Sequence, residues 1–242
     1  QSKIFGQKFR GGNALFSIIL GPLLGRIGEL NIPEPGGCII GNRSIDTHLE
    51  SFIALGAEIF RHDGIYELKA RRFSDAEVVL REFSVTATEN LLMAAALGQG
   101  ETIIKLAACE PHVQDLIKFL QALGADIEGG GTHTLKIRGK NKLRGARHAI
   151  IPDQIETGTF AVLALATGSN LVIKNVRTDH LDSILHLLRQ AGANFEARGN
   201  ILEMKTRDGL RPFRYQAMPH PGLPTDLQAP FTVLLTQAHG VS

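Results

Sequence analysis

The chain has 242 residues, of which 43% are hydrophobic, and a formal net charge of +2. This length is sufficient to bury a real core as one large or two small domains. Its 26 basic and 24 acidic residues are spread along the sequence, which argues against a nucleic-acid-binding stripe and a membrane-binding face. The two cysteines provide no disulfide framework, and this usage suits a reducing cytoplasm.

The beginning of the chain imitates a secretory signal, because basic residues precede the apolar run 14–24. We expect no signal peptide there, since no small-residue cleavage site follows, and the run is too short to span a bilayer. The chain starts at Gln1 and its first methionine is Met93, inside the repeat pattern described below. We therefore expect an internal fragment of a longer protein.

A turn-rich loop at residues 33–43 carries Cys38. Two prolines and two glycines precede this cysteine, and such residues favour turns over packed elements. Arg43 and the N-terminus of a helix expected near Asp46 would favour the thiolate. A free cysteine is more commonly a small core residue. We give that second interpretation to Cys109, which has apolar neighbours and no such loop.

Three segments further along the chain resemble one another: residues 47–59, 115–127 and 183–195. In each segment, apolar residues recur at helical spacing and a glycine then ends the helix, at the position where a left-handed cap is wanted. These glycines, which are 68 positions apart, are Gly56, Gly124 and Gly192. A short strand, a tight turn and an alternating strand are expected to follow each of them.

A second helix completes each repeat. Polar or glycine-bearing loops at 84–90, 155–159 and 223–228 introduce these helices. The Ser, Thr and Asp residues in the loops have a plain alternative role as helix caps. A period this long, with strands and helices in every copy, predicts stacked α/β modules.

The spacing of the histidines and glycines argues against several other kinds of site. Nine histidines are scattered without the spacing of metal ligands, so we expect no metal site. The glycine pairs and triplets match neither the phosphate loop nor the dinucleotide fingerprint, and no nucleophile elbow is present. Hydrolase, kinase and dehydrogenase templates are therefore not supported.

Four motifs together give a more specific indication. Residues 35–46, 84–90, 152–160 and 220–228 closely resemble the UDP-N-acetylglucosamine 1-carboxyvinyltransferase family, the enolpyruvyl transferases of early peptidoglycan synthesis. The resemblance extends over nearly the whole chain and covers somewhat more than half of a family chain. It implies an α/β fold of two lobes, each an inside-out α/β barrel of three repeated units.

The resemblance also implies where the lobes divide. Residues 1–150 correspond to the lobe that carries the cysteine loop, with its first unit truncated. Residues 151–242 correspond to an incomplete second lobe that carries the catalytic aspartate. Substrates are expected between the lobes.

The implied reaction transfers enolpyruvyl from phosphoenolpyruvate to the 3′-hydroxyl of UDP-N-acetylglucosamine and releases phosphate. The implied partners are these two small molecules, with no metal or organic cofactor, no nucleic acid and no membrane, in the cytoplasm. By resemblance, Cys38 lies on a mobile lid and protonates or captures phosphoenolpyruvate, and Asp226 accepts the hydroxyl proton. Asp226 has a rival role as a helix cap or first-turn acid.

Further residues match substrate-binding positions of the family. They comprise an arginine before the cysteine loop, the segment after the cysteine that holds uridine and diphosphate, and the loop of the next unit: Arg10, then Arg43, Ser44, Ile45, Asp46 and Thr47, then Ser84, Val85 and Thr86. Three positions depart from the family pattern. Ser44 replaces a common proline, Thr86 replaces a common glycine, and Glu82 stands where some relatives have lysine.

Other family residues that contact phosphoenolpyruvate have no counterpart in this sequence. We therefore expect the chain alone to be inactive, with exposed apolar faces on its second lobe and marginal solubility. One alternative is a shikimate-pathway enolpyruvyl transferase, against which Cys38 and the segment 43–46 argue. Another is a non-catalytic paralogue that binds the nucleotide sugar or regulates a partner.

Overall fold

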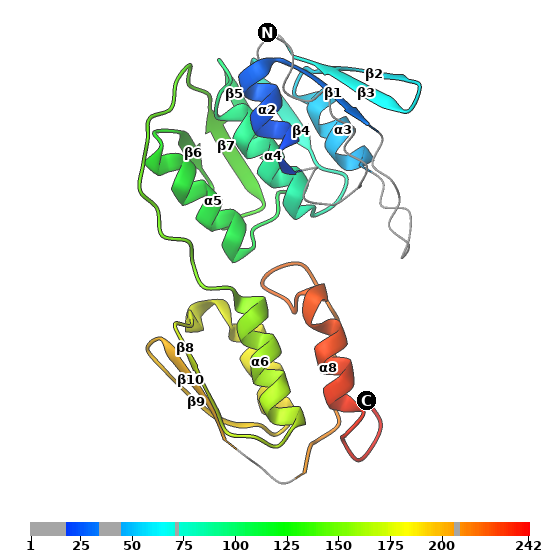
Figure 1. Ribbon diagram of the computed structural model, residues 1–242, viewed down its shortest axis with the longest axis vertical. Coiled ribbons are helices and arrows are strands. Elements are labelled where there is room, and N and C mark those ends of the chain that lie inside the picture. Colours follow the sequence, from blue (N-terminus) through cyan, green and yellow to red (C-terminus); the bar gives the residue numbers. More distant parts are fainter. Residues whose placement is uncertain (1–17, 34–44, 71–72, 206–208) are drawn as a thin grey trace. The chain divides into compact units, whose positions relative to one another are not determined.

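The computed structural model describes residues 18–33, 45–70, 73–205 and 209–242. The chain forms two compact units (Figure 1). The first unit comprises residues up to 109 together with 113–148, and the second comprises 149–242 together with 110–112. The assignment of residues 1–150 and 151–242 to functional lobes stays a prediction.

The first unit contains four helices and seven strands among its described residues. In chain order they are α2 (Leu20–Ile27), β1 (Glu29–Pro33), α3 (Asp46–Ala54), β2 (Glu58–His62), β3 (Ile65–Lys69), β4 (Ala76–Val79), α4 (Val85–Ala95), β5 (Glu101–Lys105), α5 (Pro111–Ala122), β6 (Asp126–Glu128) and β7 (Thr134–Arg138). The helix predicted near Asp46 is confirmed as α3.

Two sheets form in this unit. The first has the order β1-β3-β2 and is antiparallel throughout, with Ile32 opposite Tyr66. The second has the order β4-β5-β7-β6, in which only the pair β4 and β5 is parallel. The unit is thus an α/β structure with antiparallel and mixed sheets.

Helix α4 runs through the core of the first unit. Most of its residues are buried, including Leu91 and Leu92, which are fully buried. Helix α2 lies side by side with it (Figure 1), and α2 presents Gly21 and Gly25 to the α4 backbone at Asn90 and Ala94. The absence of side chains at these two glycines allows the two helix backbones to approach closely.

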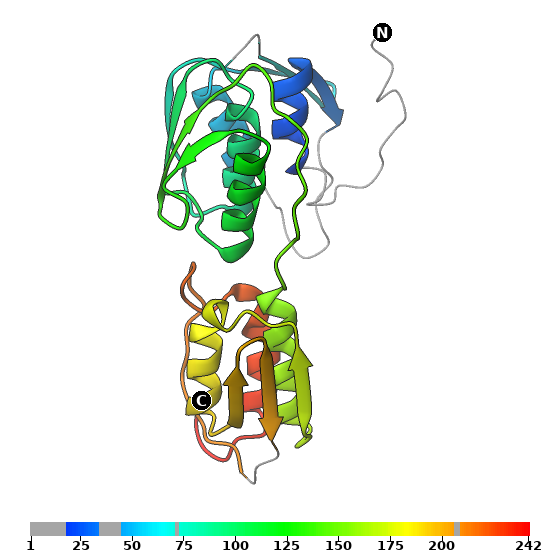
Figure 2. The ribbon, with the colours of Figure 1, turned by 90° about the vertical axis from the view of Figure 1, so that its left-hand side faces the viewer.

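The second unit has α6 (Gln154–Ala166), β8 (Leu171–Lys174), the short 3₁₀ helix η1 (Thr178–His180), α7 (Asp182–Gln190), β9 (Asn194–Arg198), β10 (Ile201–Lys205), the short 3₁₀ helix η2 (Thr225–Leu227) and α8 (Gln228–Leu235). Its antiparallel sheet has the order β8-β10-β9. Helices α6 and α8 pack side by side in this unit (Figure 2). Its core is built around Leu188, Leu202 and Phe231, each fully buried.

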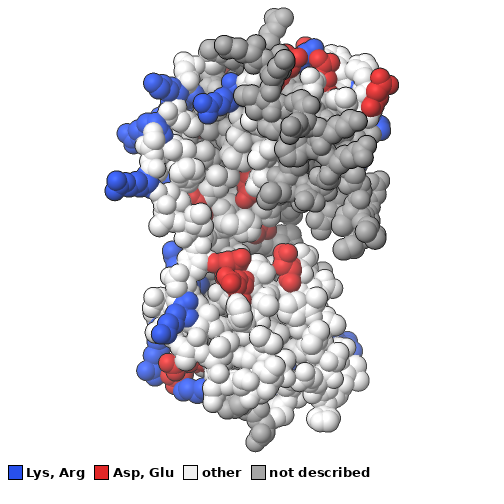
Figure 3. Space-filling view, viewed as in Figure 1, with Lys and Arg blue, Asp and Glu red and all other residues white. Residues whose placement is uncertain are grey.

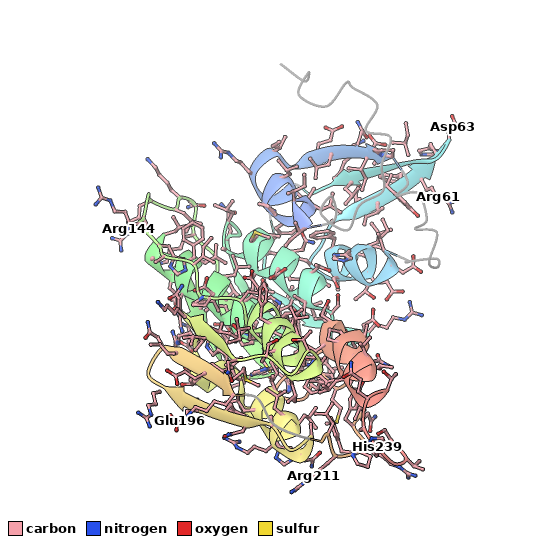
Figure 4. The ribbon with its side chains drawn as sticks, turned by 60° about the horizontal axis from the view of Figure 1, so that its bottom comes forward. Arg61, Asp63, Arg144, Glu196, Arg211 and His239 are labelled. Carbon is pink, nitrogen blue, oxygen red and sulfur yellow. The ribbon has the colours of Figure 1, made fainter. Side chains whose placement is uncertain are left out.

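The predicted repeat is confirmed in the backbone. Helices α3, α5 and α7 are followed by Gly56, Gly124 and Gly192, whose φ angles are +102°, +103° and +85°. Each helix leads into a hairpin, and the second strand of each hairpin pairs antiparallel with the strand preceding the helix: β3 with β1, β7 with β5 and β10 with β8. At the tip of the β2–β3 hairpin, Asp63 has φ of 50° (Figure 4).

The segment between β7 and α6 contains no helix or strand, but its first part is fixed on α5. The backbone N–H of Arg144 donates to the Leu123 carbonyl at 2.8 Å, and His148 Nε2 lies 2.9 Å from Asp115 Oδ1. Lys and Arg side chains gather along one edge of the first unit in Figure 3, where this segment runs. At the other end of this segment, Asp153 caps α6, and its Oδ1 atom accepts from the backbone N–H groups of Ile155 and Glu156.

Candidate functional site

The substrate-binding residues predicted from the sequence fall into three groups in the structure. Arg10, Cys38, Arg43 and Ser44 lie outside the described residues, so their predicted roles stay predictions. Ile45, Asp46 and Thr47 lie at the start of α3, and Ser84, Val85 and Thr86 lie at the start of α4. Asp226 lies in η2 of the second unit.

The start of α3 combines one exposed and one buried polar residue. Ile45 precedes the helix, and its carbonyl accepts hydrogen bonds from the backbone N–H groups of His48 and Leu49 at 3.0 Å each. Asp46 is exposed in the first turn, whereas Thr47 is buried. An acidic residue in the first turn is favourable for the helix dipole.

The start of α4 is capped by Ser84. The Ser84 Oγ atom accepts from the backbone N–H of Ala87 at 3.3 Å, and the Ser84 carbonyl accepts from the Thr88 hydroxyl at 2.8 Å. The predicted cap role of this residue is therefore confirmed. Val85 packs partly against the core, and Thr86 is half-buried.

Direct side-chain hydrogen bonds join these two helix starts. Thr47 Oγ1 donates to Glu82 Oε1 at 2.9 Å, and His48 Nε2 lies 3.2 Å from Thr86 Oγ1. His48 Nδ1 lies 3.1 Å from Asn90 Nδ2. The segments at 45–47 and 84–86, which begin the successive helices α3 and α4, are thus adjacent parts of one site.

His48 and Asn90 were not among the site residues predicted from the sequence. Both are almost fully buried, with exposed fractions of 7% and 1%. A polar residue buried to this extent usually has a hydrogen-bonding role. The available signal was position: His48 directly follows the segment 43–47, and Asn90 ends the motif 84–90.

The electrostatics of the site centre on His48. Burial lowers the pKa of the imidazole below its ordinary value, and the negative charge of Glu82 opposes this effect more weakly. Desolvation dominates because a charged imidazolium loses more hydration than a neutral ring. His48 is therefore held as a neutral hydrogen-bonding group at neutral pH.

In the second unit, the backbone before Asp226 is tightly held. The Met218 N–H donates to the Leu223 carbonyl at 3.0 Å, and the Ser183 hydroxyl donates to the Gly222 carbonyl at 3.2 Å. Buried Leu223 and Leu227 anchor the chain on both sides of the aspartate. The loop thus has a fixed path into α8.

Asp226 itself is exposed. Neither η2 nor α8 has a side-chain cap hydrogen bond at its N-cap, so the structure gives no support to the rival role of Asp226 as a capping residue. Its first-turn position in η2 agrees with the other rival role, as an acid near the positive end of a short helix. An exposed carboxylate held by buried neighbours is also sterically available to a substrate.

Cys109, to which we gave a structural role, is buried. Its Sγ atom lies 3.9 Å from His133 Nε2. Within the part of the chain that the structure describes, no group of three or more His, Cys, Asp or Glu residues is placed to hold a metal ion. None of the helices formed by the described residues is long and apolar enough to cross a bilayer.

The sequence profile of the family described as EPSP synthase (3-phosphoshikimate 1-carboxyvinyltransferase) matches residues 9–242. The chain belongs to the EPSP synthase family. The chain is also similar in sequence to curated proteins of this family. It is 44% identical, over 98% of its length, to UDP-N-acetylglucosamine 1-carboxyvinyltransferase 1 of Carboxydothermus hydrogenoformans. It is 45% identical, over 93% of its length, to the UDP-N-acetylglucosamine 1-carboxyvinyltransferase of Granulibacter bethesdensis.

The resemblance to this group within the EPSP synthase family, predicted from four motifs, is confirmed. The matched regions cover 55% and 54% of these two relatives, so the chain spans about half the length of the curated relatives it matches. The activity, substrates and partners of the whole protein therefore stay proposals.

Solved structures identify the fold. The enolpyruvyl transferase NikO from Streptomyces tendae matches with a TM-score of 0.78 and 24% identity, over 92% of this chain and 54% of that chain. An EPSP synthase from Acinetobacter baumannii matches with a TM-score of 0.61 and 19% identity, over 93% of this chain and 52% of that chain. This member of the EPSP synthase family therefore has the enolpyruvyl transferase fold, an α/β fold with mixed sheets.

Proposed function

We propose that this chain is part of an enzyme that transfers enolpyruvyl from phosphoenolpyruvate to the 3′-hydroxyl of UDP-N-acetylglucosamine, in the first committed step of peptidoglycan synthesis. The observation that carries the proposal is the 44% identity over 98% of the chain to a relative named UDP-N-acetylglucosamine 1-carboxyvinyltransferase. The joined helix starts at 45–47 and 84–86 support it, because both segments match nucleotide-sugar positions of the family.

The proposed chemistry is an addition followed by an elimination. The sugar oxygen bonds to C2 of phosphoenolpyruvate while its proton passes to a base and C3 gains a proton. Loss of a proton from C3 and departure of phosphate from C2 then give the enolpyruvyl ether. A general base near the hydroxyl and a general acid near C3 would lower both barriers.

We assign these roles by resemblance. Asp226 is the proposed base, and its exposure in η2 leaves its carboxylate accessible to a hydroxyl group. Cys38 is the proposed acid on a mobile lid that excludes water as it closes. Substrate anions are proposed to meet Arg10 and Arg43, together with Ser44 to Thr47 and Ser84 to Thr86. No cofactor takes part in this scheme.

We further propose the finer architecture that the resemblance implies. Residues 1–150 belong to one inside-out barrel with a truncated first unit, and residues 151–242 belong to an incomplete second barrel. The repeated arrangement of helix and hairpin supports this architecture, since the same strand pairing recurs in three places. The phosphorylated substrates are metabolites of the cytoplasm, which we propose as the location.

A shikimate-type acceptor is the second candidate, favoured by the description of the matching family profile. Phosphate release by the longest natural polypeptide containing this chain separates the two candidates. We expect release with phosphoenolpyruvate to depend on UDP-N-acetylglucosamine, and dependence on shikimate 3-phosphate would overturn our proposal. We expect the 242-residue chain alone to show no turnover.

The variant Cys38→Ser tests the enzymatic proposal against the non-catalytic paralogue. We expect it to abolish phosphate release by the longest natural polypeptide and to leave UDP-N-acetylglucosamine binding intact. Unchanged turnover would remove this cysteine from the mechanism. Binding without turnover in the unmodified polypeptide would favour the paralogue.

A further inference from the structure

A buried chain of hydrogen bonds links α2, α4 and α3 behind the joined helix starts. It begins at the backbone N–H of Gly21, which lies 2.6 Å from Asn90 Oδ1. A backbone N–H can only donate, so the oxygen of the Asn90 amide must face Gly21. The Asn90 amide nitrogen therefore faces the opposite side, and its orientation is fixed.

The Asn90 amide nitrogen then determines the tautomer of His48. Asn90 Nδ2 lies 3.1 Å from the Thr86 carbonyl oxygen and 3.1 Å from His48 Nδ1. An amide nitrogen is a donor only, so His48 Nδ1 must accept and carries no proton. Since the buried ring is neutral, its single proton lies on Nε2.

The proton on His48 Nε2 in turn orients the Thr86 hydroxyl. His48 Nε2 donates to Thr86 Oγ1, 3.2 Å away, so the hydroxyl oxygen is an acceptor on that side. The hydroxyl proton must therefore point elsewhere, and none of the described residues provides an acceptor for it. Because Thr86 is half-buried in the first turn of α4, this O–H is accessible to a bound molecule.

We propose that His48 and Asn90 are positioning residues, which orient the Thr86 hydroxyl as a hydrogen-bond donor to an oxygen of the nucleotide sugar. The inference rests on the proposed function, since it concerns the same site. Thr86 stands where the family commonly has glycine, so this donor is a feature of this chain's own side chains. It adds a specificity-determining contact to those proposed for the segment from Ser84 to Thr86.

The test compares UDP-N-acetylglucosamine binding to the 242-residue chain by calorimetry, in the unmodified protein and in Thr86→Val. Valine has nearly the shape of threonine but no hydroxyl. We expect about tenfold weaker binding, in keeping with the loss of one hydrogen bond to a charged or strongly polar oxygen. Thr86→Ser restores the hydroxyl and should bind within about twofold of the unmodified chain.

Thr236→Val is the matched control. Thr236 is an exposed threonine at the end of α8, and its hydroxyl donates to the Val233 carbonyl at 2.7 Å. Its replacement should leave binding unchanged. A ¹⁵N NMR spectrum of the histidine rings provides an independent readout, in which His48 should be neutral with its proton on Nε2. Thr86→Val should shift the His48 Nε2 resonance, because that nitrogen loses its acceptor.

The outcomes separate this inference from the proposed function. A charged His48, or a proton on Nδ1, overturns the inference whatever the ligand does. Equal binding by the unmodified chain and Thr86→Val overturns the inference alone. No binding of UDP-N-acetylglucosamine by the unmodified chain, with His48 in the expected tautomer, overturns the nucleotide-sugar site in this chain and the donor role with it.

Discussion

The protonation state of one buried residue, His48, affects the stability of the first unit. Burial lowers the pKa of its imidazole from the ordinary value of 6.5, so the folded protein keeps this ring neutral at pH values where the unfolded chain binds a proton. Its contribution to stability is complete above about pH 6.5 and is lost as the pH falls from there toward the folded pKa. The charged group that acts on it is the Glu82 carboxylate, which moderates the effect.

We compare the unmodified chain with His48→Gln at pH 7.5 and at pH 5.5. As the pH falls between these values, the free energy of unfolding of the unmodified chain should decrease by up to about 1 kcal/mol more than that of the variant. The glutamine variant should be less stable at pH 7.5, because it loses the hydrogen bonds of the imidazole to Thr86 and Asn90, but it lacks the titrating ring. Urea unfolding at the two pH values measures the difference. Parallel pH dependence in the two proteins would show that His48 takes a proton equally well when folded.

At the level of elements, the contact between α2 and α4 depends on two glycines, Gly21 and Gly25. An added Cβ atom would have less room at the first than at the second. A Cβ added at Gly21 would lie 2.2 Å from the Asn90 carbonyl oxygen, whereas one added at Gly25 would lie 3.2 Å from the Ala94 carbonyl oxygen. The first distance cannot be accommodated unless the helices separate. The second requires a shift of only a few tenths of an ångström.

Gly21→Ala should therefore destabilise the chain by about 2 kcal/mol or more, despite the better helix propensity of alanine. Gly25→Ala is the matched control in the same helix and should stay within about 1 kcal/mol of the unmodified chain, since propensity and crowding oppose each other. Chemical unfolding of both variants provides the comparison. Equal effects would mean that α2 adjusts freely against α4.

At the scale of the whole molecule, the described residues form two separate hydrophobic cores, one in each unit. The first includes Phe52 and the second includes Phe231, and both side chains are fully buried. Exposed apolar side chains also occur in the second unit, including Phe160, Leu163 and Val233. These residues lie on α6 and α8. The exposed apolar faces predicted for the second lobe and the marginal solubility of the chain stay predictions.

Because the cores are separate, we expect calorimetry to resolve two unfolding transitions. Phe52→Ala should lower the midpoint of one transition and Phe231→Ala that of the other, since truncating a buried phenylalanine costs about 3–5 kcal/mol within its own core. Each variant serves as the control for the other. A single sharp transition that either variant shifts would show that the units unfold together.

The sequence by itself determined the features that depend on neighbouring residues. Gly56, Gly124 and Gly192 marked the helix ends, because a left-handed residue after a helix favours glycine. The Ser84 cap was predictable for the same local reason. The 68-residue period therefore revealed the repeat, and the four motifs revealed the family before any tertiary contact was known.

Only the tertiary structure decided which side chains meet. Asn90 bonds to His48 across 42 positions and to Gly21 across 69 positions, and no spacing rule relates residues so distant in sequence. The tautomer of His48 and the direction of the Thr86 hydroxyl follow from those contacts. Burial and hydrogen-bond partners depend on how α2, α3 and α4 pack together, which local propensity does not encode.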